Sequence, residues 1–107
     1  MRLIVLVGLL WAGTAQASDV PRYDPEGYCK EVASFSGEYS AMLDNSCLEM
    51  EQGAYDELKA GWGGYSGHAQ SYCDEVARFG GKGSYNLLKS CIEMEEQAAD
   101  NKKKFKF

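Results

Sequence analysis

The chain has 107 residues, with 11 Lys and Arg against 16 Asp and Glu and a formal net charge of −5. Four of the lysines lie in residues 102–106, so residues 18–101 carry 6 basic and 16 acidic side chains. An acidic body of this kind argues against nucleic acid as the main partner. The length is enough for one small domain, whose core is marginal unless crosslinks support it.

Residues 1–17 have the features of a secretory signal peptide. Arg2 precedes an apolar run over residues 3–11, and Ala15-Gln16-Ala17 forms a small-x-small cleavage signal. The run is too short for a comfortable membrane span, which disfavours the alternative of an uncleaved anchor. We therefore expect cleavage before Ser18, export to the periplasm or the medium, and a compartment in which cysteines can pair.

From residue 28 onward the sequence repeats itself at a fixed offset of 44 residues. Residues 28–56 and 72–100 are identical at 16 of 29 positions without a gap, and all four cysteines occupy matching places. A fixed period of this size indicates a duplicated supersecondary unit.

The first copy, within residues 18–60, is expected to form two helices. Asp24 is a suitable N-cap before Pro25, and Ser40 is the next N-cap candidate after a Ser-Gly turn. The apolar positions at helical spacing are Tyr28, Val32 and Phe35 in the first helix, and Leu43, Cys47, Met50 and Ala54 in the second. We interpret these stripes as the buried faces of the helices. Gly53 favours a bend or an early end of the second helix; the alternative is that the helix continues through residues 55–60.

The glycine-rich residues 61–68 are expected to link this unit to a second hairpin over residues 69–100. The same plan returns there, with Ser84 as N-cap and with apolar positions Tyr72, Val76, Phe79, Leu87, Cys91, Met94 and Ala98. Residues 101–107 are basic and lack periodicity, so we expect a flexible tail. The predicted fold is all-α, with four helices arranged as two tandem disulfide-stapled αα-hairpins.

The cysteine spacing favours one pairing out of three. The midpoint between Cys29 and Cys47 falls inside the first predicted turn, and that between Cys73 and Cys91 falls inside the second. Residues equidistant from the turn face each other in an antiparallel helix pair, so these are the natural structural disulfides. Each would contribute about 3 kcal/mol to stability. No C-x-x-C motif is present, which argues against thioredoxin-like, haem-attachment and zinc-knuckle chemistry.

No catalytic constellation stands out in the sequence. His68 is the only histidine, and a triad would have to combine it with Ser66 or Ser71 at the end of a glycine-rich linker. No nucleophile elbow surrounds any serine, and a lone imidazole meets none of the usual criteria for an active site. We therefore expect a protein that is not an enzyme and that needs no cofactor.

Glutamates are retained in both copies. Glu51 and Glu95 lie beside the predicted core stripes, whereas Glu49 and Glu93 point nearly opposite the cysteines at ~100° per residue. Three explanations for the outward pair stay open: the copies pack through that face, the face contacts a partner, or the duplication is recent. Cation binding by these carboxylates is an alternative, although no loop of alternating oxygen ligands accompanies them. Met50 and Met94 are assigned to the core.

Aromatic residues outside the helices suggest other contacts. Trp62 and Tyr65 could anchor a protein partner, or they could cover the seam between the hairpins. Phe105 and Phe107, among the tail lysines, could touch an anionic membrane surface weakly or add as a strand to a carboxylate-binding domain. The simplest alternative is a solvated tail.

The motifs resemble a known group of proteins. Tyr-Cys-x-Glu-Val-Ala-x-Phe, a Gly-x-x-Ser turn and Cys-x-x-Met-Glu are similar to those of small exported proteobacterial proteins of uncharacterised function. The second copy, with Gly80-Gly81-Lys82-Gly83-Ser84-Tyr85, is closer to that pattern than the first. The resemblance implies a periplasmic helical protein and no activity.

These observations favour a non-enzymatic exported module that presents helix faces to a protein partner. A small divalent-cation-binding protein that uses the repeated carboxylates is the alternative, and an inhibitor of another exported protein is a further one.

Overall fold

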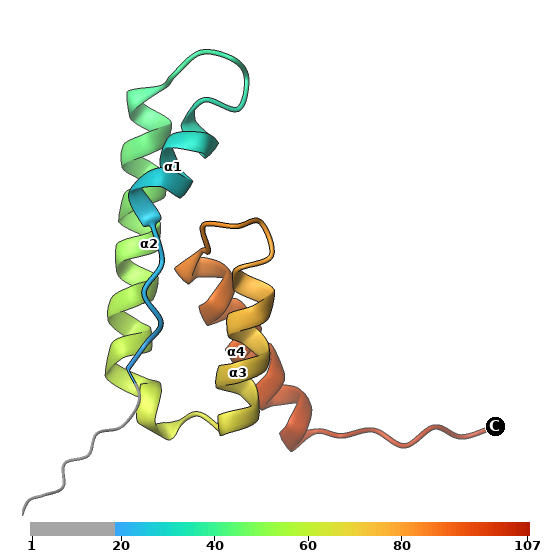
Figure 1. Cartoon of the computed structure of the whole chain (residues 1–107). Helices are drawn as coiled ribbons and strands as arrows, with labels where there is room; N and C mark the ends of the chain where they lie inside the picture. The colour runs from blue at the N-terminus through green and yellow to red at the C-terminus, as the bar shows by residue number, and fades with distance from the viewer. Residues whose placement is uncertain (1–18) are drawn as a thin grey trace, which may run out of the picture.

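The computed structural model describes residues 19–107; the predicted signal peptide lies outside the described residues. In order along the chain, the elements are α1 (Pro25–Ala33), α2 (Ala41–Gly61), the 3-10 turn η2 (Trp62–Gly64), α3 (Gly67–Ala77) and α4 (Tyr85–Asp100). α1 pairs with α2 and α3 with α4, and α4 also packs on α2. The second hairpin therefore lies beside the C-terminal half of α2, while α1 and the start of α2 project beyond it (Figure 1). The predicted all-α fold of two hairpins is confirmed, and none of the helices described is long and apolar enough to cross a membrane.

Side-chain caps begin the helices where the sequence predicts them. Asp24 Oδ1 accepts a hydrogen bond from the Gly27 amide at 3.0 Å, and Ser40 Oγ accepts one from the Leu43 amide at 3.1 Å. Ser84 Oγ plays the same part for the Leu87 amide at 3.2 Å. These bonds satisfy amides that a helix N-terminus leaves without an intrahelical partner.

Of the two interpretations of Gly53, the early end is wrong and the continuous helix is confirmed. α2 continues as one α-helix from Ala41 to Gly61. Ala54 and Leu58, which follow the glycine, are both buried in the core. Their packing offsets the cost of about 1 kcal/mol that a glycine adds inside a helix.

Both predicted disulfides are present. Cys29 pairs with Cys47 and Cys73 with Cys91, and the Cα–Cα distance is 5.5 Å in each. The helices of each hairpin are therefore close together at the bridge. Small residues fill the seam, since Cys29 and Ala33 are buried in the first hairpin and Cys73 and Ala77 in the second.

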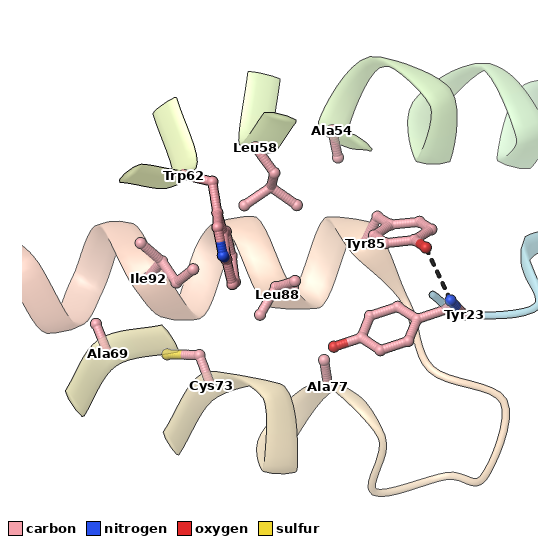
Figure 2. Packing of buried hydrophobic residues seen from close by; sticks show 10 residues of the cluster. All are labelled: Tyr23, Ala54, Leu58, Trp62, Ala69, Cys73, Ala77, Tyr85, Leu88 and Ile92. Atoms are coloured by element: carbon pink, nitrogen blue, oxygen red, sulfur yellow. Dashed lines mark hydrogen bonds between the residues drawn. The ribbon is translucent and has the colours of Figure 1, made fainter. Parts of the chain in front are cut away.

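The main core lies between the hairpins and coincides with the predicted stripes only at Ala54 and, at its edge, Cys91. Figure 2 shows Leu58 and Trp62 directed at Leu88 and Ile92 of α4, with Ala54 near Tyr85 and with Ala69, Cys73 and Ala77 of α3 beneath. The core assignment is wrong for Val32, Phe35, Leu43 and Met50, and for Tyr72, Val76, Phe79, Leu87, Met94 and Ala98, all of which are exposed. The physical reason is the close approach of the helices at each disulfide, which leaves room for Cys and Ala and places larger side chains at the flanks.

Residues 19–24 fasten the two hairpins together. The Tyr23 ring stacks on Tyr85 at a centroid distance of 4.6 Å, and the Tyr23 amide donates to the Tyr85 hydroxyl at 2.8 Å (Figure 2). The Tyr23 hydroxyl donates to Asp74 Oδ1 at 2.7 Å. Burial, reinforced by this hydrogen bond, raises the pKa of the Tyr23 phenol far above its ordinary value, so the donor stays protonated. The segment thus connects the start of α1 to both helices of the second hairpin.

Gly83→Ala should destabilise the protein because it disturbs the packing of Tyr23 between the hairpins. Gly83 has φ +84°, and a Cβ there would lie 2.6 Å from the Tyr23 ring. We expect a loss of about 2–4 kcal/mol, because backbone strain adds to displacement of the ring. Gly81→Ala is the matched control, since Gly81 has φ +112° but open space around it. Thermal melts should show the larger fall for Gly83→Ala; equal falls would contradict the contact with Tyr23.

Candidate protein-binding surface

Each hairpin carries the same four large apolar side chains on its surface, and we call this set the repeated apolar face. It consists of Val32, Phe35, Leu43 and Met50 in the first hairpin and of Val76, Phe79, Leu87 and Met94 in the second. The exposed fractions match in pairs: 38% and 38%, 93% and 94%, 46% and 48%, 59% and 70%. Two separate parts of the molecule therefore present the same chemistry to solvent.

The helical geometry gathers these side chains on one side of each hairpin. Val32 lies in the last turn of α1, Phe35 follows just after the end of that helix, and Leu43 and Met50 are separated by two turns of α2. At ~100° per residue, Val32, Leu43 and Met50 flank the disulfide from the same side of the antiparallel helices. The side chains thus form a strip that spans both helices.

A glutamate borders this strip at each edge. Glu31 lies at the outer edge on α1 and Glu49 at the outer edge on α2, with Glu75 and Glu93 at the same places in the second hairpin. The Glu93 side chain is 58% exposed and pairs with Lys89 at 3.2 Å, and Lys89 also lies 3.6 Å from Glu57 of α2. Glu93 therefore lies at the margin of the contact between the hairpins and is not buried in it.

The opposite side of each hairpin differs between the copies. Tyr85, Leu88 and Ile92 of α4 are buried against α2. The corresponding residues of α2 are Ala41, Asp44 and Leu48, and Asp44 accepts a hydrogen bond from the Tyr39 hydroxyl at 2.6 Å. That bond raises the pKa of the Tyr39 phenol. The two copies therefore differ at the residues that α4 buries against α2, whereas the residues of the exposed strip are the same in both.

Glu51 is the main polar contact between the hairpins. Its carboxylate, only 3% exposed, accepts hydrogen bonds at the N-terminus of α4 from Ser84 Oγ at 2.9 Å, the Tyr85 amide at 2.6 Å and the Asn86 amide at 3.2 Å. The arrangement satisfies a buried charge with the donors of a helix N-terminus. Its counterpart Glu95 is partly exposed and lies 3.6 Å from His68 Nε2.

An open groove runs between residues 19–26 and α2. Its volume is about 1080 Å³, and Tyr55, Trp62 and Tyr85 contribute aromatic surface to the lining. Asp19, Glu26, Arg22 and Lys59 line it as well, so charges of both signs are mixed there. No set of catalytic groups converges in this groove among the residues described, and it does not recur in the second hairpin.

The remaining sequence candidates are dispersed. Trp62 is 6% exposed and packs in the seam between the hairpins, as the second interpretation of this residue expected. Tyr65 is half-buried and meets the Trp62 ring edge-on at 6.0 Å. His68 is exposed and stacks on Tyr72 at 5.7 Å, so no catalytic triad forms around it in the described part.

Neither a metal site nor a contact of the tail aromatics with the helices is evident in residues 19–107. No three His, Cys, Asp or Glu side chains gather there as a metal ion would require. Phe105 and Phe107 are exposed and pack edge-on against each other at 4.9 Å. Figure 1 shows the tail leading away from the helices.

Both disulfides are formed and no free cysteine is left in residues 19–107, which indicates an oxidising, extracellular type of compartment. Comparisons with protein-family models, curated proteins and solved structures gave no match.

Proposed function

We propose that the protein is an exported, non-enzymatic binding module whose two hairpins hold a protein partner through the repeated apolar face. The identity of the exposed apolar residues in both copies carries this proposal. The site of action is the periplasm or the medium, consistent with the disulfides and the signal-like N-terminus.

Drift after duplication accounts poorly for the pattern of identity. The two copies differ at 13 of 29 aligned positions, including residues buried between the hairpins such as Leu88 and its counterpart Asp44. Stability alone constrains exposed positions least. Phe35 and Phe79 are more than nine-tenths exposed and are still the same residue. A requirement outside the folded chain, such as a partner, explains why these large apolar side chains are kept at exposed positions in both copies.

Two copies of one face favour a bivalent interaction. A partner with two matching sites, or two copies of a partner, gains affinity because the second contact forms at a high effective concentration. Both hairpins also share one rigid arrangement through Glu51 and the core, which fixes the spacing of the faces.

Photo-crosslinking from the face tests this function. Phe35 or Phe79 is replaced by a photo-reactive phenylalanine analogue in cells that export the protein. We expect both positions to give an adduct with the same partner, because both faces are chemically the same. Met42, which is exposed but absent from the second copy, is the control position and should not give this adduct. Different partners from positions 35 and 79, or adducts equally strong from 42, would contradict the proposal.

Stability measurements separate binding from folding. Phe35→Ala and Phe79→Ala should change the free energy of unfolding by less than about 0.5 kcal/mol, because these side chains make little contact with the body. Leu88→Ala, at a fully buried position, should cost about 3 kcal/mol. Partner crosslinking should fall for the two phenylalanine variants although their melting temperatures are unchanged. If Phe35→Ala destabilised the protein as much as Leu88→Ala, the repeated apolar face would be needed for folding, and the proposal would be contradicted.

A further inference from the structure

We propose that the C-terminal tail, residues 102–107, binds the repeated apolar face of a second copy of this chain. This inference rests on the proposed function, because it uses the same face. It adds a specific ligand chemistry: a short basic segment with two aromatic side chains. The protein would then associate with itself before, or in competition with, any other partner.

The tail is basic and aromatic, whereas the repeated apolar face lies on an acidic body. It contains four lysines and two phenylalanines within six residues, whereas residues 18–101 carry 6 basic and 16 acidic side chains. Phe105 and Phe107 are exposed, and within the described chain each makes an aromatic contact only with the other's ring. Successive residues of an extended segment point to opposite sides, so Phe105 and Phe107, two residues apart, can place both phenyl rings on one surface. Lysine side chains are long enough to reach past them to either edge.

The face offers apolar surface between acidic edges. The apolar strip can take the rings of Phe105 and Phe107, and the bordering glutamates can pair with the lysines. Glu31 is already paired with Lys82 at 3.1 Å and Glu93 with Lys89 at 3.2 Å. Neither Glu49 nor Glu75 has an ion pair with another residue of the described chain, so each hairpin keeps one edge carboxylate for a lysine.

Distance favours binding to a second copy over folding back. Asp100 ends α4, and Leu87 lies 13 residues earlier, which is ~20 Å along a helix. Five extended residues from Asp100 to Phe105 span at most ~18 Å, and seven residues to Phe107 span at most ~25 Å. Phe105 therefore falls short of Leu87 in its own strip, and Phe107 reaches it only when the tail is almost fully extended. Each copy then offers one tail and two faces, so the contact joins different surfaces of the two copies.

The test uses the full chain and one synthetic peptide. Sedimentation velocity of the wild-type protein at 50 mM salt should show concentration-dependent association up to millimolar concentration, weakened at least ~fivefold at 500 mM salt because exposed charges are screened. Phe105→Ser/Phe107→Ser should stay monomeric. A peptide of residues 101–107 added to that double variant should bind at two equivalent sites, and Phe35→Glu should remove one of them.

Three results would overturn the inference. They are a wild-type protein that is monomeric throughout, a peptide that binds as well with both phenylalanines replaced by alanine, or a tail that binds anionic phospholipid vesicles without any self-association. A different result tests the proposed function. If the wild-type protein does not self-associate but crosslinks from positions 35 and 79 to the partner persist in Phe105→Ser/Phe107→Ser, the tail inference is wrong and the proposed function stands.

Discussion

Replacing both Cys73 and Cys91 by serine is expected to unfold the whole described body, whereas replacing Cys29 and Cys47 should release mainly α1. Each disulfide closes a similar loop, with a sequence separation of 18, and should contribute about 3 kcal/mol. The consequences differ because Cys73 lies inside the main core and Cys29 does not. A small domain has only about 5–15 kcal/mol of stability, so the first loss is severe.

Local release of α1 follows from its length and its contacts. The helix has 9 residues and packs chiefly on α2. Isolated helices shorter than ~12 residues are marginal in water. Hydrogen exchange should therefore show loss of protection for α1 amides in Cys29→Ser/Cys47→Ser, while the Leu58, Leu88 and Ile92 amides stay protected. Equal loss of protection across all helices in both double variants would contradict this division.

Glu51→Ala is expected to separate the hairpins. The substitution removes a carboxylate that accepts three hydrogen bonds at the N-terminus of α4, and it leaves those donors buried. Caps and charge-assisted hydrogen bonds of this kind contribute about 1–2 kcal/mol each, so we expect a loss of about 3 kcal/mol. At roughly 4–8 °C per kcal/mol, the melting temperature should fall by about 15 °C.

Glu95→Ala is the matched control for this experiment. Glu95 occupies the same place in the second copy but is partly exposed, with His68 as a distant partner. Its loss should change the free energy of unfolding by less than about 0.5 kcal/mol. Glu51→Gln should fall between the two, since an amide oxygen can still accept some of these bonds. If Glu51→Ala and Glu95→Ala melted alike, Glu51 would have no special role in joining the hairpins.

The sequence predicts the parts of the fold that local chemistry determines. N-caps at Asp24, Ser40 and Ser84 and the two disulfide pairs follow from residue type and spacing, and the structure contains all of them. The duplication also predicts two equivalent hairpins. These features depend on contacts within about twenty residues, which a single sequence expresses directly.

The long-range packing could not be read in the same way. Helical periodicity marks apolar faces but does not say which one is buried, and the faces through Val32 and Met50 are exposed in the structure. The contact of Tyr23 with Tyr85 joins residues 62 positions apart, and Tyr23 lies outside the repeat with no local signature. The position of Glu51 beside the predicted stripe indicates closeness to the core but not its hydrogen bonds at the N-terminus of α4.

One signal in the sequence bears on the candidate surface. The residues that differ between the copies, such as Asp44 and Leu88, follow one side of the second helix of each hairpin, and the apolar residues that are kept follow another. The difference between Asp44 and Leu88 marks a contact that only one copy makes, since Leu88 belongs to the main core and Asp44 does not. Agreement at large apolar positions then indicates a surface that both copies use.

The methyl groups of three methionines test the bivalent surface most directly. Residues 19–107 contain Met42, Met50 and Met94, all exposed, and only the last two belong to the repeated apolar face. With ¹³C-methyl methionine in the protein, addition of the partner identified by crosslinking should shift or broaden the Met50 and Met94 signals together and leave Met42 unchanged. A partner that perturbs Met42 while Met50 and Met94 keep their free positions would contradict the account.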